Sequence, residues 1–157
     1  MTDLDLQPVV IYEEDARDLA QRLDAFLKAS RSSLVILIDR SGQVIAERGY
    51  ARKREADELA ALAAAAFAAT EQVAKLIGEN SFSVLFHQGE ERNIHLSVVG
   101  ESALMLTAFD DRTTLGLVRL YAGEAAQSLM PVVERIQTRT APADLPDVGD
   151  RRLFSGS

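Results

Sequence analysis

The stretch Glu55–Gly78, EADELAALAAAAFAATEQVAKLIG, organises this chain of 157 residues. Eight of the ten residues from Ala60 to Ala69 are alanine, which has the highest intrinsic helix propensity, and no proline or glycine interrupts the stretch before Gly78. Acidic residues lie in its first turn and Lys75 lies in its last turn, as the helix dipole favours. Because Gly78 stands where a helix commonly ends, the sequence predicts one long helix here.

Two apolar stripes of different character run along this predicted helix. The first is bulky and is expected to face the protein's own core. It consists of Leu59, Leu62, Phe67, Val73 and Ile77, with Ala63, Ala66, Thr70 and Ala74 between them. The second is a smooth face that allows another backbone to come close, and it consists of Ala61, Ala64, Ala65, Ala68 and Gln72. We interpret this smooth face as a binding surface for a partner; the alternative is that alanine serves only helix propensity.

Length and composition limit the possible classes of protein. Residues 1–138 are predicted to form a single domain, and residues 139–157, rich in proline, glycine, serine and aspartate, a mobile tail. Within that tail, Arg151-Arg152-Leu153-Phe154 is either a short docking motif or an unstructured terminus. The absence of cysteine excludes disulfides and thiolate chemistry. A net charge of −7 argues against a general nucleic-acid binder.

The two ends of the chain and its apolar runs carry no signal for export or membrane insertion. The N-terminus has no basic segment followed by a long apolar run. No stretch has the roughly 18 uninterrupted apolar residues that span a bilayer. We therefore expect a cytoplasmic protein without membrane insertion.

The hydrophobic periodicity predicts the order helix, hairpin, helix, three-stranded meander, helix. Helices are expected from Glu13 to Ala29 and from Leu115 onward, with Pro131 kinking or breaking the latter. The expected strands are residues 34–38, 43–50, 81–88, 92–99 and 103–109. The first and the last of these, LVILI and ALMLTAF, are apolar on nearly every residue, which is typical of strands in the middle of a sheet. We expect these two strands to be neighbours in an α/β fold.

No motif of a known catalytic or metal site is present. The chain lacks a phosphate loop, GxGxxG, GxSxG and HExxH. His87 and His95 lie in predicted strands and could face each other across a hairpin, but without further ligands they are expected to be structural. Asp39 and the pairs Glu90-Glu91 and Asp110-Asp111 are interpreted as turn residues. We therefore expect neither catalytic residues nor a cofactor nor a metal.

One basic cluster precedes the alanine-rich helix. It consists of Arg48, Arg52, Lys53 and Arg54. Such clusters are more often solvated loops than binding sites, and the sequence leaves both interpretations open.

Three segments resemble the Roadblock (dynein light chain) family, and within it the bacterial MglB-type proteins. They are VILIDRSGQVIAERG at residues 35–49, AKLIGENSFSVLFHQG at residues 74–89 and FDDRTTLGLVRL at residues 109–120. The resemblance covers roughly residues 12–137. This chain differs from the family at Ala65, Phe67 and Gln72. Relatives commonly carry a Gly-Asn pair before two alanines, and they carry a small residue where this chain has Gln72.

This resemblance implies a five-stranded antiparallel sheet of order 2-1-5-4-3, with one helix on one face and two on the other. It also implies a homodimer formed by pairing of the third strands and packing of the middle helices. On these helices, Ala61, Ala64, Ala65, Ala68 and Gln72 would form the platform for a small Ras-like GTPase of the MglA type. Family members activate that GTPase in cell polarity and motility by shifting its own catalytic groups rather than by donating an arginine.

Three functions remain open at this point. The first is a non-catalytic GTPase activator, and the second is a Roadblock scaffold or adaptor that does not activate. The third, a small-molecule sensor, requires an apolar cavity lined by polar groups, which the sequence does not mark.

Overall fold

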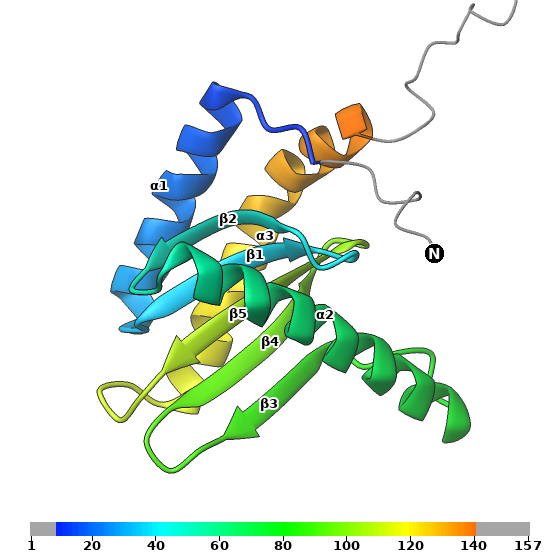
Figure 1. Ribbon diagram of the computed structural model, residues 1–157. Coiled ribbons are helices and arrows are strands. Elements are labelled where there is room, and N and C mark those ends of the chain that lie inside the picture. Colours follow the sequence, from blue (N-terminus) through cyan, green and yellow to red (C-terminus); the bar gives the residue numbers. More distant parts are fainter. Residues whose placement is uncertain (1–8, 141–157) are drawn as a thin grey trace, which may run out of the picture.

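The computed structural model describes residues 9–140, which form three helices and a five-stranded antiparallel sheet (Figure 1). The predicted strand order is confirmed as β2-β1-β5-β4-β3. The elements in chain order are α1 (Glu13–Ser30), β1 (Leu34–Asp39), β2 (Val44–Gly49), α2 (Lys53–Leu76), β3 (Val84–Gln88), β4 (Asn93–Val99), β5 (Ala103–Phe109) and α3 (Leu115–Thr140).

The two most apolar strands lie in the middle of the sheet, as predicted. β1 pairs with β5 along its whole length, from Leu34 opposite Ala108 to Asp39 opposite Ala103. Every residue of β1 except Asp39 is buried. The sheet is covered on both faces, by α2 on one and by α1 and α3 on the other (Figure 1). Strands covered on both sides need apolar residues at every position, which explains their unbroken runs.

Two separate cores result from this layering. The core between the sheet and the pair α1 and α3 is built mainly from Leu19, Leu23, Phe26, Val35, Leu37, Met105, Leu129, Val132 and Ile136. The core beneath α2 contains Leu34, Ile36, Ile38, Ala56, Ala60, Ala63, Phe67, Leu96, Leu104 and Leu106. Phe67 is the one large α2 side chain among the buried residues of this second core, so alanine forms most of the helix surface that touches the sheet.

The prediction of which α2 residues face the core was partly wrong. Phe67, Ala63 and Ala74 are buried as expected. Leu62, Val73 and Ile77, however, are exposed to 69%, 50% and 65%. Alanine can face either a core or the solvent, and here its short side chain lets α2 lie close to the sheet. The buried stripe is therefore rotated away from the largest side chains.

By length and mean hydropathy alone, α2 is the one helix within residues 9–140 that is apolar enough to cross a membrane. Its hydropathy comes largely from alanine, and it lies on the sheet through Ala56, Ala60, Ala63, Phe67 and Ala74.

The last helix begins as the sequence predicts but is not broken at Pro131. The Oγ1 atom of Thr114 accepts a hydrogen bond from the N–H of Leu117 at 3.2 Å, so Thr114 is the N-cap. α3 continues through Pro131, which is exposed on its outer side. Of the predicted tail, Arg139 and Thr140 belong to α3, and the rest lies outside the described residues.

Candidate protein-binding surface

The five residues predicted as a binding surface lie on the outward side of α2, and we call them the α2 platform. Ala61, Ala65, Ala68 and Gln72 are exposed, whereas Ala64 is half-buried. No residue from Leu59 to Thr70 is charged. At a rise of 1.5 Å per residue, this gives an exposed ridge about 18 Å long without a charge. A helix that contacts only water usually carries charged residues on its outer face.

One margin of the platform is fixed by the fold. Gly42, in the β1–β2 turn, has a φ of +96°, and a Cβ atom placed on it would lie 3.2 Å from the Cα of Ala61 and 3.6 Å from the Cβ of Ala64. The turn therefore lies directly against this part of α2. The small side chain of Ala64 therefore serves packing against the turn, a reason beyond helix propensity and partner binding.

The side of α2 that faces β3 carries a second exposed surface, which is apolar and bulky. It consists of Leu62, Val73, Leu76 and Ile77, on and directly after α2. A groove of about 310 Å³ lies beside them, lined by Leu59, Leu62, Ala63, Ala66, Leu85, His87, Ile94, Leu96 and Leu106. β3 is an edge strand, with β4 as its one neighbour in the sheet. Exposed apolar surface beside an unpaired strand edge is typical of an interface.

The two histidines do not face each other across the hairpin, so the pairing that the sequence left possible is not formed. Phe86 lies opposite His95 and His87 lies opposite Ile94, so the two imidazoles project from opposite faces of the sheet. His87 is exposed and lines the apolar groove. His95 is buried on the α3 side, where burial and the charge of Arg119 lower its pKa.

A small polar cluster surrounds His95. Thr107 lies directly opposite it on β5, and Ser97 lies two residues further along β4 on the same face. The side-chain polar atoms of these three residues are buried without a hydrogen-bond partner in the protein. Within residues 9–140, no group of three or more His, Asp or Glu side chains could hold a metal ion. Buried polar atoms without a hydrogen-bond partner cost free energy in a folded protein.

The carboxylates singled out in the sequence act as turn residues. The Oδ1 atom of Asp39 accepts hydrogen bonds from the backbone N–H groups of Ser41 and Gln43, both at 3.0 Å. Asp110 accepts from the backbone N–H of Arg112 at 3.1 Å and also binds its guanidinium, which lowers the pKa of Asp110. For Asp39 and Asp110, these contacts confirm the interpretation as turn formers.

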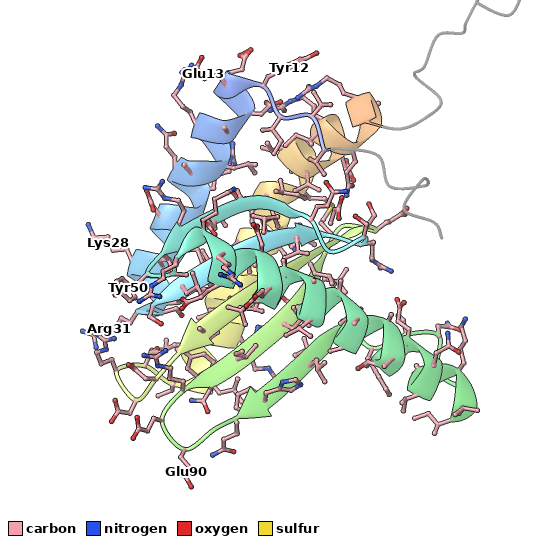
Figure 2. All side chains as sticks on the ribbon, viewed as in Figure 1. Tyr12, Glu13, Lys28, Arg31, Tyr50 and Glu90 are labelled. Atoms are coloured by element: carbon pink, nitrogen blue, oxygen red, sulfur yellow. The ribbon has the colours of Figure 1, made fainter. Side chains whose placement is uncertain are left out.

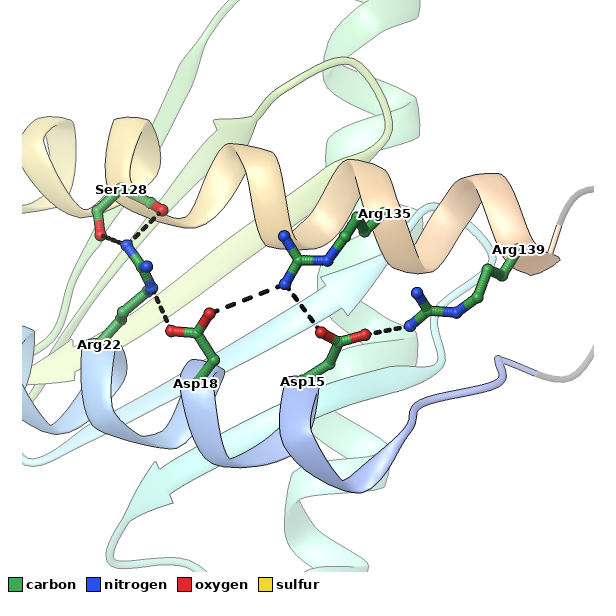
Figure 3. A network of polar contacts seen from close by, with 6 residues as sticks. All are labelled: Asp15, Asp18, Arg22, Ser128, Arg135 and Arg139. Carbon is green, nitrogen blue, oxygen red and sulfur yellow. Dashed lines mark hydrogen bonds and ion pairs between the residues drawn. The ribbon is translucent and has the colours of Figure 1, made fainter.

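An ion-pair network centred on the buried Asp15 ties α1 to the end of α3 on the face opposite α2 (Figure 3). Asp15 is 4% exposed and accepts hydrogen bonds from Arg135, at 2.8 Å, and from Arg139. These hydrogen bonds lower the pKa of the Asp15 carboxyl. The guanidinium of Arg139 also stacks 4.2 Å above the ring of Tyr12. Sequence analysis missed this network because its members are far apart in the chain.

Comparison with known proteins gives one family and several similar structures. The Roadblock/LC7 domain family matches residues 19–109. The gliding protein MglB of Thermus thermophilus is 32% identical, with a TM-score of 0.76, over 83% of this chain and 98% of that one. Myxococcus xanthus MglB is 35% identical, with a TM-score of 0.74, over 81% of this chain and 96% of that one. A structure of MglB with a tetrameric arrangement is 32% identical, with a TM-score of 0.78, over 83% of this chain and 98% of that one. A search of curated protein sequences gave no match.

The chain thus belongs to the Roadblock/LC7 domain family, since the family match covers more than half of its length. Within this family it is of the MglB type, because its similarity to MglB proteins extends over nearly their whole length. The resemblance read from the three sequence segments is therefore confirmed.

Proposed function

We propose that this protein is a homodimeric regulator of a small Ras-like GTPase of the MglA type and acts as its activating protein in cell polarity or motility. The observation that carries the proposal is the exposed, uncharged α2 platform, on which a second protein can approach the helix backbone closely. The similarity to MglB proteins, one of them a gliding protein, supports the choice of partner.

An activator of this kind needs no catalytic centre of its own. Positioning the groups of a GTPase for phosphoryl transfer contributes ~10³–10⁵ in rate, or about 4–7 kcal/mol. A surface that binds the correctly arranged GTPase more tightly than the relaxed one supplies this energy. Docking on the α2 platform can therefore activate the GTPase when it favours the correctly arranged state.

The homodimer is proposed from the second exposed surface. Two copies that pair their β3 edges would form one continuous sheet. The same arrangement would bring Leu62, Val73 and Leu76 of each copy toward the partner's apolar groove and remove them from water. One MglB relative is described with a tetrameric arrangement, which supports association between copies. The two platforms would then lie side by side as one docking surface.

The test of GTPase binding is Ala68→Arg. A long charged side chain on the platform blocks close approach, so we expect binding of an MglA-type GTPase to be lost while the melting temperature stays nearly unchanged. Ala25→Arg is the matched control, because Ala25 is also an exposed alanine but lies on α1 on the opposite face of the sheet. Full binding by Ala68→Arg would contradict the platform.

A non-activating adaptor is the alternative, and it uses the same surface. It is favoured by Gln72, which stands where relatives of the resembled family commonly carry a small residue. GTP hydrolysis by the GTPase, measured with and without this protein, separates the two functions. Binding without faster hydrolysis would establish the adaptor.

A further inference from the structure

Charge is distributed unevenly along this acidic protein. From Lys28 to Arg54 the chain has seven Lys or Arg residues and two Asp or Glu residues. From Glu55 to Asp111 it has two Lys or Arg residues and ten Asp or Glu residues. The positive segment contains the basic cluster that the sequence analysis left open. It ends where α2, and therefore the platform helix, begins.

The fold gathers these cations at one end of the sheet. The backbone N–H of Tyr50 donates to the carbonyl of Ser33 at 3.0 Å, which joins the segment before α2 to the loop after α1. Gly49 permits this contact, because a Cβ atom on it would lie 2.3 Å from the Ser33 carbonyl oxygen. Lys28, Arg31 and Tyr50 project from the same end of the molecule (Figure 2). We call Lys28, Arg31, Arg52, Lys53 and Arg54, with Tyr50 among them, the basic rim.

The neighbouring arginines outside the rim are neutralised within the protein. Arg48 forms two hydrogen bonds with the carboxylate of Asp24, at 2.8 and 3.0 Å. Arg112, which lines the same shallow pocket as Arg31, is held by Asp110.

The rim cations themselves are far less engaged. Arg54 reaches Glu58 at 3.8 Å through a highly exposed contact, which contributes little. Lys28, Arg31 and Lys53 make no ion pair with the other described residues. Tyr50 is 91% exposed. The rim is thus positive charge and aromatic surface that the fold does not use.

The rim continues into the platform. Arg54 precedes Ala61, Ala65 and Ala68 by seven, eleven and fourteen residues, a spacing that places all four on one side of a helix. Between Arg54 and Ala61 lie two exposed carboxylates, Asp57 and Glu58, of which Glu58 pairs with Arg54. A protein that covers the platform and extends toward the N-terminus of α2 therefore passes these carboxylates before it reaches Arg54 and the rest of the rim.

Building on the proposed function, we propose that the basic rim binds an acidic patch on the GTPase and orients it on the platform. Tyr50 adds an aromatic contact beside that patch. Opposite charges at the edge of an interface accelerate association and select the orientation more than they raise the final affinity. The uncharged platform alone would let the GTPase rotate about α2. The rim holds one end of the GTPase and so fixes its orientation.

An acidic protein fits this surface better than the other polyanions. The overall charge of −7 repels nucleic acid beyond the small rim. An anionic membrane would bind the cations alone and leave the α2 platform unused, whereas a protein contacts both. Both alternatives are nevertheless outcomes that the experiment distinguishes.

The experiment measures association and dissociation rates of the full-length protein with an MglA-type GTPase over a series of sodium chloride concentrations. The test variant is Arg52→Glu combined with Arg54→Glu. Negative charge at the start of α2 favours the helix dipole, so the helix is retained. The matched control is Arg17→Glu combined with Arg119→Glu, which changes the net charge equally at exposed positions on α1 and α3, across the sheet. Melting temperatures of both variants check the fold.

We expect the test variant to associate about tenfold more slowly at low salt and to approach the wild-type rate at high salt, with the control near wild type. Maximal GTP hydrolysis at saturation should be unchanged. An unchanged association rate of the test variant would contradict the proposed role of the rim and would leave the proposed role of the platform unaffected. Loss of maximal hydrolysis instead would overturn it in favour of a direct catalytic arginine.

Two further results separate the rim from the proposed function. If the wild-type protein does not bind the GTPase, or if Ala68→Arg binds it fully, the proposed function fails first. If the test variant loses binding to phosphatidylglycerol vesicles or to single-stranded DNA while its association with the GTPase is unchanged, the rim serves that ligand and the proposal is wrong.

Discussion

Gly42 and Ala61 lie so close that a Cβ atom on Gly42 would be 3.2 Å from the Ala61 Cα. The β1–β2 turn, held by the Asp39 carboxylate, thereby lies directly against α2. This contact positions the platform relative to the sheet. It also separates two roles of alanine, since the half-buried Ala64 packs at the turn whereas Ala68 is exposed away from the sheet.

Replacing Gly42 should destabilise the fold. Gly42→Ala introduces a Cβ atom against backbone at a φ of +96°, and we expect a loss of about 1–3 kcal/mol. Gly123→Ala is the matched control, because a Cβ atom at this exposed helical position meets nothing within 4 Å. The control variant should gain about 0.5–1 kcal/mol in free energy of unfolding. Urea unfolding measures both, and equal stability of the two variants would rule out the tight contact.

Charging the β3-facing side of α2 should separate the proposed dimer. Val73→Glu places a carboxylate on the exposed apolar surface that a second copy would cover, so we expect a monomer of unchanged helical content. Leu120→Glu is the control, because Leu120 is similarly exposed at 54% but lies on α3 across the sheet. Analytical ultracentrifugation gives the mass. A dimer that persists in Val73→Glu would place the interface elsewhere.

His95 should make stability fall in mild acid. Its pKa is lowered by burial and by Arg119 from the ordinary value of 6.5, so below pH 6.5 the unfolded chain binds a proton that the folded chain does not. Stability should decrease from pH 6.5 down to the lowered pKa and show no contribution from His95 above pH 6.5.

The variant His95→Leu tests this assignment. It removes the titrating group together with its unpartnered ring nitrogens, so the decrease in urea midpoint between neutral pH and about pH 5 should become smaller. His87→Leu, at an exposed histidine, is the comparison. An identical pH profile for wild type and His95→Leu would assign the decrease to other groups.

Asp15 should contribute stability that disappears at low pH. Its pKa lies below the ordinary 3.8 because Arg135 and Arg139 bind the carboxylate, so the contribution is complete above pH 3.8 and is lost as the pH falls through the folded pKa. Asp15→Asn should therefore melt at a lower temperature than wild type at neutral pH, and the gap should close in strong acid.

The control for Asp15 is Glu13→Gln. Glu13 forms an exposed pair with Arg17 at 3.4 Å on the same helix, and such pairs contribute little. Calorimetry over a pH series compares the three proteins. A gap between wild type and Asp15→Asn that stays constant in strong acid would show that the lost interaction is not the titrating ion pair.

Most of the fold could be predicted from local sequence. Alanine propensity and Gly78, which has a φ of +84°, specify α2 and its end. The unbroken apolar runs of β1 and β5 predict the two central strands, because a strand covered on both faces has no polar side. The exposed positions Ala61, Ala65, Ala68 and Gln72 were also identified in advance, although their partner remains a proposal.

Other features were decided by tertiary structure. The rotation of α2 on the sheet could not be read from its sequence, since alanine packs equally well inside and outside, and Leu62 and Val73 are consequently exposed. Strand register, which depends on pairing over long distances, placed His87 and His95 on opposite faces.

What the sequence by itself determined about this protein is thus the set of elements and the order of the central strands, because these follow from propensity and periodicity within short segments. The tertiary structure alone decided which small residues meet a neighbour and which remain free for a partner. That distinction depends on contacts such as Gly42 with Ala61 and Tyr50 with Ser33, which join segments distant in the chain. Local preferences carry no information about such contacts.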